Sequence, residues 1–118
     1  MANDKDFILK NALEVGGIIK GTLGTITSSD LDLSTGEYFT DTLAANTTYT
    51  FSNAADVQTF YLEVVGASTY TIAWPTTVDW ANGITPDAPS AGDTNFFIFS
   101  TDDGGTTYQG FKLIESLS

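Results

Sequence analysis

Apolar and polar residues alternate one by one in short runs between residues 30 and 74, and this alternation constrains the fold more than any other feature of the chain. In residues 59–64 (TFYLEV), Phe, Leu and Val occupy every second position. Successive side chains of a β-strand point to opposite faces, so each run predicts a strand with one buried face. The same pattern recurs in residues 30–33, 37–40, 48–52 and 69–74. Since no window shows sustained 3.6-residue periodicity, we expect little helix.

The second half of the chain contains a loop and two further strands. Residues 75–94 hold all three prolines, which lack a ladder donor, and therefore predict a long ordered loop. Residues 95–100 (NFFIFS) are apolar at both alternate sets of positions, which predicts a central strand covered on both sides. Residues 102–105 (DDGG) predict a turn before a last strand at 106–113, and residues 66–68 predict a hairpin connection.

The first 25 residues differ from the rest of the chain in composition. Four glycines fall within positions 16–24, and they would weaken any helix there. We interpret residues 1–25 as an extended arm and residues 26–118 as the folded domain. The predicted fold class is therefore all-β, a single antiparallel β-sandwich or small barrel-like domain with an N-terminal extended arm. The arm has too few apolar residues to bury itself, so we expect it to contact another subunit or the capsid through Phe7, Ile8, Leu9, Leu13, Val15, Ile18 and Ile19.

The charge balance excludes several classes of partner. The chain has four Lys, no Arg and 15 acidic residues, for a net charge of −11. Cationic side chains are needed to replace counterions on phosphates, so neither nucleic acid nor an anionic membrane is an expected partner. Two interpretations of the acidity stay open: a solvated surface, or complementarity to a basic partner or hard cations. The polar N-terminus, with Asp4 and Asp6, predicts neither a signal peptide nor a membrane span, so we expect the protein to be made in a cytoplasm.

The residue types also limit the chemistry. With no Cys and no His, thiolate and imidazole catalysis and thiolate metal sites are excluded. A carboxylate-pair glycosidase is compatible with the composition but needs a deep groove, so we predict no enzymatic activity, no cofactor and no metal. Asp102 and Asp103, with Asp93, are the best candidates for Ca²⁺ ligands, but the spacing matches no calcium loop and favours a solvated turn.

The aromatic residues allow two interpretations. Tyr70, Trp74, Trp80 and Tyr108 suit a sugar-stacking platform, in which Tyr70 and Trp80 form the ligand surface. The alternative, which we favour, places Trp74 in the core and uses Trp80 to attach the proline-rich loop to the sheet, because aromatic side chains are large hydrophobic anchors.

One segment carries a resemblance to a known group of proteins. Residues 74–86 read W-P-T-T-V-D-W-A-N-G-I-T-P and follow the strand-like residues 48–53 and 60–64. They precede residues 97–111, which end D-D-G-G-T-T-Y-Q-G-F. This order, over half to two-thirds of the chain, resembles a module of tailed-phage virion proteins, and residues 10–17 are more weakly similar to leader segments of phage fibre-like proteins. The resemblance implies a homo-oligomeric particle component and carries over no catalytic residue.

The short length narrows that implication, because 118 residues supply one module and an arm. We expect a capsid decoration (cement) protein that acts as a homotrimer, with the major capsid protein as partner and the virion as its location. The alternative is a tail-fibre or tail-tip receptor-binding module that recognises a host surface glycan through Tyr70, Trp80 and residues 75–94. A carbohydrate-binding module of a secreted enzyme is a third reading, which the absence of a signal peptide disfavours.

Overall fold

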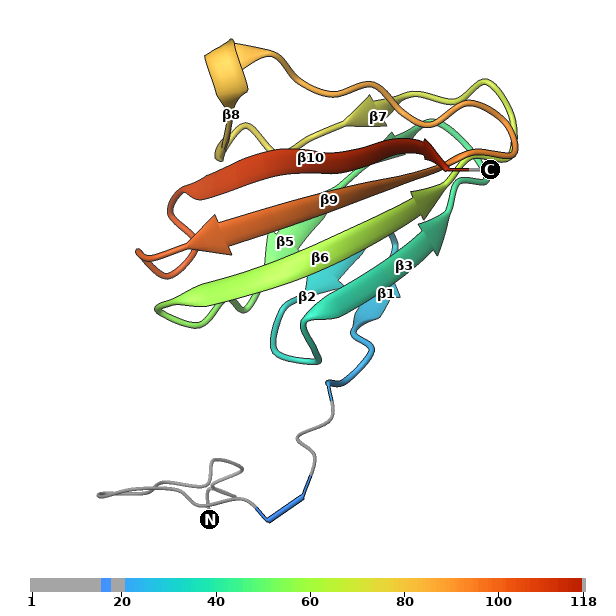
Figure 1. The fold of residues 1–118 in the computed structure, drawn as a ribbon. Helices are drawn as coiled ribbons and strands as arrows, with labels where there is room; N and C mark the ends of the chain where they lie inside the picture. Colours follow the sequence, from blue (N-terminus) through green and yellow to red (C-terminus); the bar gives the residue numbers. More distant parts are fainter. Residues whose placement is uncertain (1–15, 18–20, 118) are drawn as a thin grey trace.

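The computed structural model describes residues 16–17 and 21–117, and that part of the chain is built almost entirely of strands (Figure 1). It contains no α-helix, only the single 3₁₀ turn η1 (Ala81–Gly83). The prediction of an all-β domain is therefore confirmed. The ten strands are β1 (Thr25–Thr27), β2 (Asp30–Asp32), β3 (Tyr38–Thr42), β4 (Thr47–Thr48), β5 (Thr50–Ser52), β6 (Gln58–Val65), β7 (Ile72–Ala73), β8 (Val78–Trp80), β9 (Thr94–Thr101) and β10 (Tyr108–Leu117).

The largest layer is a five-stranded sheet in the order β3-β6-β9-β10-β8. Strands β6, β9 and β10 are antiparallel neighbours, whereas β3 pairs in parallel with β6 and β8 pairs in parallel with β10. The prediction of an antiparallel sheet is therefore wrong. Parallel neighbours need a crossover connection rather than a hairpin, and the chain between β3 and β6 makes this crossover through β4 and β5. The sheet is open, since β3 and β8 form its two edges, so the barrel alternative is also wrong.

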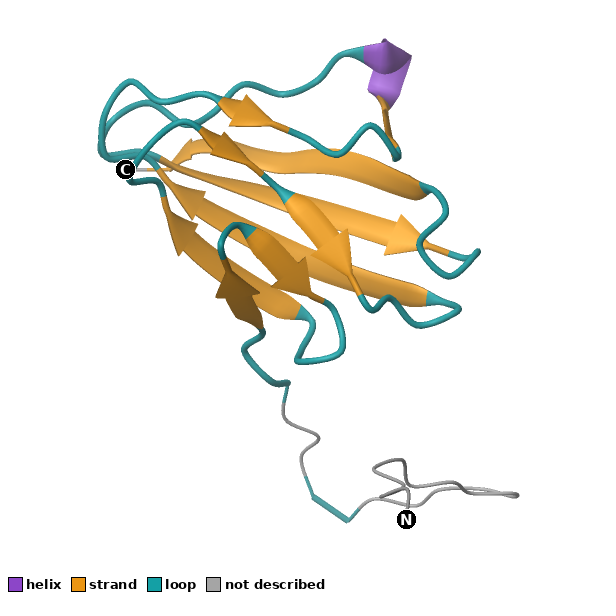
Figure 2. Cartoon of the chain, turned by 180° about the vertical axis from the view of Figure 1, so that it is seen from behind, coloured by secondary structure: helices purple, strands orange, loops and turns teal. Residues whose placement is uncertain are grey.

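A second layer lies behind this sheet and consists of two small sheets (Figure 2), β1-β2-β5 and β4-β7. The ring of Phe51 from β5 reaches across the interface and lies about 5 Å, centroid to centroid, from those of Phe60, Phe99 and Tyr108. Contacts at this separation are typical of edge-to-face aromatic packing. The fully or almost fully buried core residues are Leu31, Leu33, Phe39, Leu43, Tyr49, Phe60, Leu62, Val64, Trp74, Val78, Phe97, Phe99 and Tyr108.

Two local predictions about the connections are wrong. Residues 66–68 do not join a hairpin, because β6 pairs with β3 and β9 while the chain continues to β7 in the other layer. Residues 75–94 contain β8 as well as loop, since the first three residues after Thr77 pair with the start of β10. The turn prediction at residues 102–105 is confirmed, because Gly104 and Gly105 take the positive φ values of 70° and 86°.

Trp74 attaches the proline-rich loop to the body. Its ring is buried in the core, and its indole Nε1 donates a hydrogen bond of 3.0 Å to the backbone oxygen of Pro86. The prediction that Trp74 belongs to the core is confirmed. The role predicted for Trp80, that of holding the loop, is thus carried at least in part by Trp74.

The described body begins beside β3. The backbone N–H of Gly24 donates to the carbonyl of Tyr38, and the missing side chain of Gly24 leaves room for the ring of Phe39. Among the described residues, no helix is long and apolar enough to cross a bilayer. Most of the predicted arm, including all seven of its apolar contact residues, lies outside the described residues.

Candidate functional site

The most distinctive surface of the described body is the face of the five-stranded sheet that points away from the second layer, which we call the outer face. The register of the strands places Phe111 beside Ile98, Ile98 beside Tyr61, and Tyr61 beside Tyr38. These four residues therefore form a continuous row across β10, β9, β6 and β3. In Figure 1 the outer face is turned to the viewer, and no described element lies over it.

The side chains of this row are open to solvent to an unusual degree for large apolar groups. Phe111 is 53%, Tyr61 39% and Tyr38 36% exposed, and Ile98 is half-buried. Phe96, two residues before Ile98 on β9, is also half-buried. The prediction that β9 is covered on both sides is therefore not met within the described part of the chain. A contiguous exposed apolar surface is typical of a site where another chain binds.

One hydrogen bond fixes the tyrosine at the end of the row. The hydroxyl of Tyr38 donates to Glu63 Oε2 at 2.9 Å, and the rings of Tyr38 and Tyr61 lie 6.1 Å apart. Burial, and then the hydrogen bond to Glu63, raise the pKa of Tyr38 above its ordinary value. Tyr38 therefore stays neutral across the physiological range, and the row adds no negative charge of its own to the outer face.

Charge is depleted on the outer face relative to the rest of the body. Residues 21–118 contain twelve acidic residues. By strand alternation only Glu63 and Asp79 among them lie on the outer face of the sheet. Depletion of charge together with exposed Tyr and Phe is the composition found at the centre of protein–protein interfaces.

The opposite side of the molecule provides an internal comparison. The exposed side of the β1-β2-β5 sheet carries Asp30 and Asp32, which are tied to polar side chains of β5 and the following turn. Thr50 Oγ1 and Ser52 Oγ donate to the two oxygens of Asp30 at 2.7 and 2.5 Å, and Asn53 Nδ2 donates to Asp32 at 3.0 Å. Hydrogen bonds from Ser34 and then Asn53 lower the pKa of Asp32. The acidic face thus presents hydrogen-bonded carboxylates to solvent, whereas the outer face presents aromatic and aliphatic side chains.

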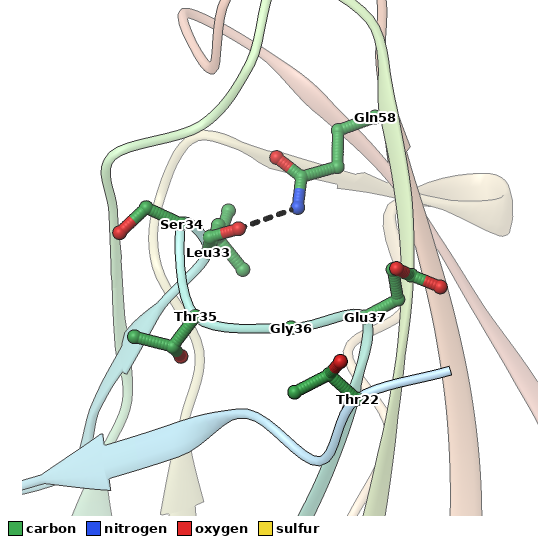
Figure 3. Close-up of a pocket in the computed structure, with 7 residues that line it drawn as sticks. All are labelled: Thr22, Leu33, Ser34, Thr35, Gly36, Glu37 and Gln58. Atoms are coloured by element: carbon green, nitrogen blue, oxygen red, sulfur yellow. Dashed lines mark hydrogen bonds between the residues drawn. The ribbon is translucent and has the colours of Figure 1, made fainter. Parts of the chain in front are cut away.

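A small polar hollow lies between the β2–β3 turn and the start of β6 (Figure 3). Its volume is about 230 Å³. The side-chain amide of Gln58 crosses it and donates to the backbone oxygen of Leu33 at 2.8 Å. Glu37 is the one charged residue among the described residues of its lining, and most of the others are polar. The lining residues are Thr22, Leu33, Ser34, Thr35, Gly36, Glu37 and Gln58.

A second, more apolar hollow of about 300 Å³ lies between the proline-rich loop and β10. It is lined by Trp80, Ala81, Ile84, Pro86, Gly110, Phe111 and Lys112. The ring of Trp80 packs against Trp74 with a centroid separation of 5.2 Å. Its indole N–H is buried and has no hydrogen-bond acceptor among the described residues.

The two residues predicted to form a sugar-binding surface are not in ring contact in the described part of the chain. Tyr70 is half-buried against the core before β7, and Trp80 ends β8 and packs with Trp74, Phe97 and Phe99. The hollow beside Trp80 remains as the feature relevant to a ligand.

Both carboxylate oxygens of Asp103 accept hydrogen bonds from neighbouring threonines. Its Oδ1 accepts from the hydroxyl of Thr101 and the backbone N–H of Thr107, and its Oδ2 accepts from the hydroxyl of Thr107 at 2.7 Å. Hydrogen bonds from Thr107, side chain and then backbone, lower the pKa of Asp103 to about 2. Asp93 and Asp102 do not join it in a cluster of three acidic ligands within residues 16–17 and 21–117.

Sequence reasoning did not identify the outer-face row. Each of its members sits in a segment predicted to be a strand, but the row exists only because the register aligns four strands, two of them in parallel. The exposed apolar residues of β10 include Leu113 and Ile114, and the apolar sequence of residues 111–114 is the signal that could have indicated them.

Comparison with protein-family models, with curated proteins and with solved structures found no match for this chain.

Proposed function

We propose that this chain is a non-enzymatic structural protein of a tailed-phage particle, and that it acts as a capsid decoration protein that binds the major capsid protein as a homotrimer. The observation that carries the proposal is the outer face, a charge-poor row of Tyr38, Tyr61, Ile98 and Phe111 on an otherwise acidic body. A flat aromatic sheet face suits contact with another folded protein. The resemblance of residues 74–86 and 97–111 to virion modules indicates the kind of assembly.

The acidic remainder of the surface fits this role as well. Twelve acidic residues and one lysine in residues 21–118 keep the exposed side of a decorated particle hydrated and resistant to aggregation. The polar network of Asp30, Asp32, Thr50 and Ser52 lies on the small sheet, on the side opposite the outer face. In this arrangement one side of the molecule binds the particle and the other side faces water.

The test is a binding experiment with particles that lack this protein, prepared from a phage whose gene for it is deleted. Purified chain is added, the particles are pelleted, and bound protein is quantified. We expect saturable binding that falls at least tenfold for Tyr61→Lys, which places a charge in the row, and that is retained for the matched control Thr50→Lys on the acidic face. Absence of binding, or equal loss in the two variants, contradicts the proposal.

A second candidate function is a tail-fibre or tail-tip module that binds a host surface glycan. The apolar hollow beside Trp80 favours it, because an aromatic ring next to an exposed pocket is suited to stacking on a sugar. Electron microscopy of the particles with bound, gold-labelled chain separates the two: label on the capsid supports decoration, and label on the tail supports the alternative. Binding to a glycan array that is lost in Trp80→Ala, with the fold intact, supports the alternative further.

A further inference from the structure

Beyond its pairing with β8, strand β10 has an edge without a backbone hydrogen-bond partner among the described residues. Strand β8 pairs with β10 only over residues 108–110. No other backbone hydrogen bond recorded for the described residues satisfies residues 111–115 on that side. The bulge between Lys112 and Ile114 twists this edge without covering it. We call residues 111–115 the β10 edge.

Three side chains of the β10 edge are apolar and about half exposed to solvent. Phe111, Leu113 and Ile114 are 53%, 53% and 46% exposed. Proteins normally protect such an edge with charge, proline or a covering element, because unpaired N–H and C=O groups beside apolar side chains recruit another strand. Lys112 is the one cation on this edge, and it is paired with Glu115 at 2.9 Å.

The hollow beside Trp80 adjoins this edge at the point where β8 leaves it. Phe111 and Lys112 form one wall of the hollow, and Ile84 and Pro86 form the other. A strand added to the β10 edge continues the line of β8, and its first side chain enters this apolar space. Main-chain hydrogen bonds supply affinity in such a complex, and a pocket of this kind supplies specificity.

The N-terminal segment 7–13 (FILKNAL) has the chemistry this edge requires. It holds five apolar residues, one lysine and no acidic residue. The body is different, because residues 21–118 contain twelve acidic residues and a single lysine. Residues 1–20 hold three lysines and three acidic residues, and none of those acidic residues lies within 7–13. An apolar, cationic segment is therefore electrostatically matched to the anionic body, whereas two bodies repel each other.

The described chain enters the body at the edge of the five-stranded sheet away from β10. Gly24 is hydrogen-bonded to Tyr38 of β3, which forms the sheet edge on the side away from β10. Figure 1 shows the chain approaching β1 and β3 from one side while β10 lies toward the other. Gly24 and the β10 edge are thus separated by three strand spacings, about 14 Å. The choice of a neighbouring copy as the acceptor comes from the homotrimer of the proposed function.

We propose that residues 7–13 of one copy add as a strand to the β10 edge of the next copy, with an apolar side chain in the hollow beside Trp80. Each copy donates on one side and accepts on the other, so the contact is heterologous and closes into a ring. This inference rests on the proposed function, because it supplies the contact that holds the homotrimer together. It leaves Tyr38, Tyr61 and Ile98 of the outer face free to bind the particle.

The test uses two full-length variants that break opposite halves of the contact. Leu9→Pro removes a ladder donor from the donor segment, and its control is Asn3→Pro outside the apolar run. The double variant Leu113→Lys, Ile114→Lys protects the acceptor edge with charge, and its control is Val57→Lys at a site that is 75% exposed. Molecular mass in solution is measured by light scattering, and folding is checked by circular dichroism.

Three different masses are expected, one for each number of intact contacts. The unmodified chain and the two controls give three times the 12.6 kDa of one chain. Each variant alone gives the mass of one chain. An equimolar mixture of the two variants gives the mass of a pair, because one copy still has an intact donor and the other an intact acceptor, and a single contact cannot close a ring.

Three results overturn the proposal: an unmodified chain with the mass of one copy, variants that keep the unmodified mass, or a mixture that stays at one copy. Its failure is distinguishable from failure of the proposed function. If the chain binds particles in the pelleting experiment but the variants keep the mass of the unmodified chain, only the strand-addition contact is refuted. If the chain does not bind particles, the proposed function is refuted, whatever masses the variants have.

Discussion

The same Phe→Ala change, made separately at Phe99 and at Phe111, tests the two faces of the sheet. Phe99 pairs with Gly110 and points into the core, while the next residue of β10, Phe111, points to the outer face. The ring of Phe99 is fully buried and lies 5.0 Å from Phe51 and 5.1 Å from Phe60, whereas Phe111 is 53% exposed. Identical chemistry is thus removed from the interior and from the surface.

The expected losses differ several-fold. Removing a buried Phe side chain costs about 3–5 kcal/mol in the free energy of unfolding, from lost transfer energy and the cavity that remains. This is a large part of the roughly 5–15 kcal/mol that holds a domain of this kind together. Phe111→Ala removes only half-buried area and should cost about 1 kcal/mol.

The assay is thermal unfolding followed by tryptophan fluorescence, at a protein concentration low enough for the chain to be monomeric. Phe99→Ala should lower the melting temperature by roughly 10–25 °C, and Phe111→Ala by a few degrees. Equal losses for the two variants, or a larger loss for Phe111→Ala, would refute the assignment of the faces on which the candidate site depends.

Two further predictions concern close packing and titration. Gly110→Ala should destabilise the protein by about 1–3 kcal/mol and shift the tryptophan emission, because a Cβ there would approach the ring of Trp80 to 2.9 Å; Gly21→Ala, with open space around it, should be neutral in the same unfolding assay. Asp103, whose pKa of about 2 lies below its ordinary 3.8, contributes stability that is present above pH 4 and is lost as the pH falls toward 2. Asp103→Asn should therefore flatten the dependence of melting temperature on pH in that window; a variant that keeps the slope of the unmodified chain would contradict this.

The sequence predicted the strands well because alternation reports directly which side chains share a face. Phe60, Leu62 and Val64 are all fully buried, as the pattern in residues 59–64 required, and Thr59 and Tyr61 point outward. The short strand β8 was missed because Pro75 and the prolines after it made residues 75–94 look like loop throughout.

Partner choice between strands could not be read in the same way. Alternation fixes the face of a residue but not its neighbour on the next strand, and the parallel pairing of β3 with β6 joins segments on either side of β4 and β5. The row of Tyr38, Tyr61, Ile98 and Phe111 depends on that pairing. The candidate site was therefore absent from the sequence analysis although every one of its residues was visible there.

The central claim is that the outer face is where other protein chains bind. An electron cryomicroscopy map of the particle that carries this protein tests it most directly, because the map shows which side of the domain is covered. The account predicts that Tyr61 and its neighbours in the row are buried against another chain, while Asp30 and Asp32 on the small sheet face solvent. A map in which the acidic face is buried and the aromatic row is open to water would contradict it.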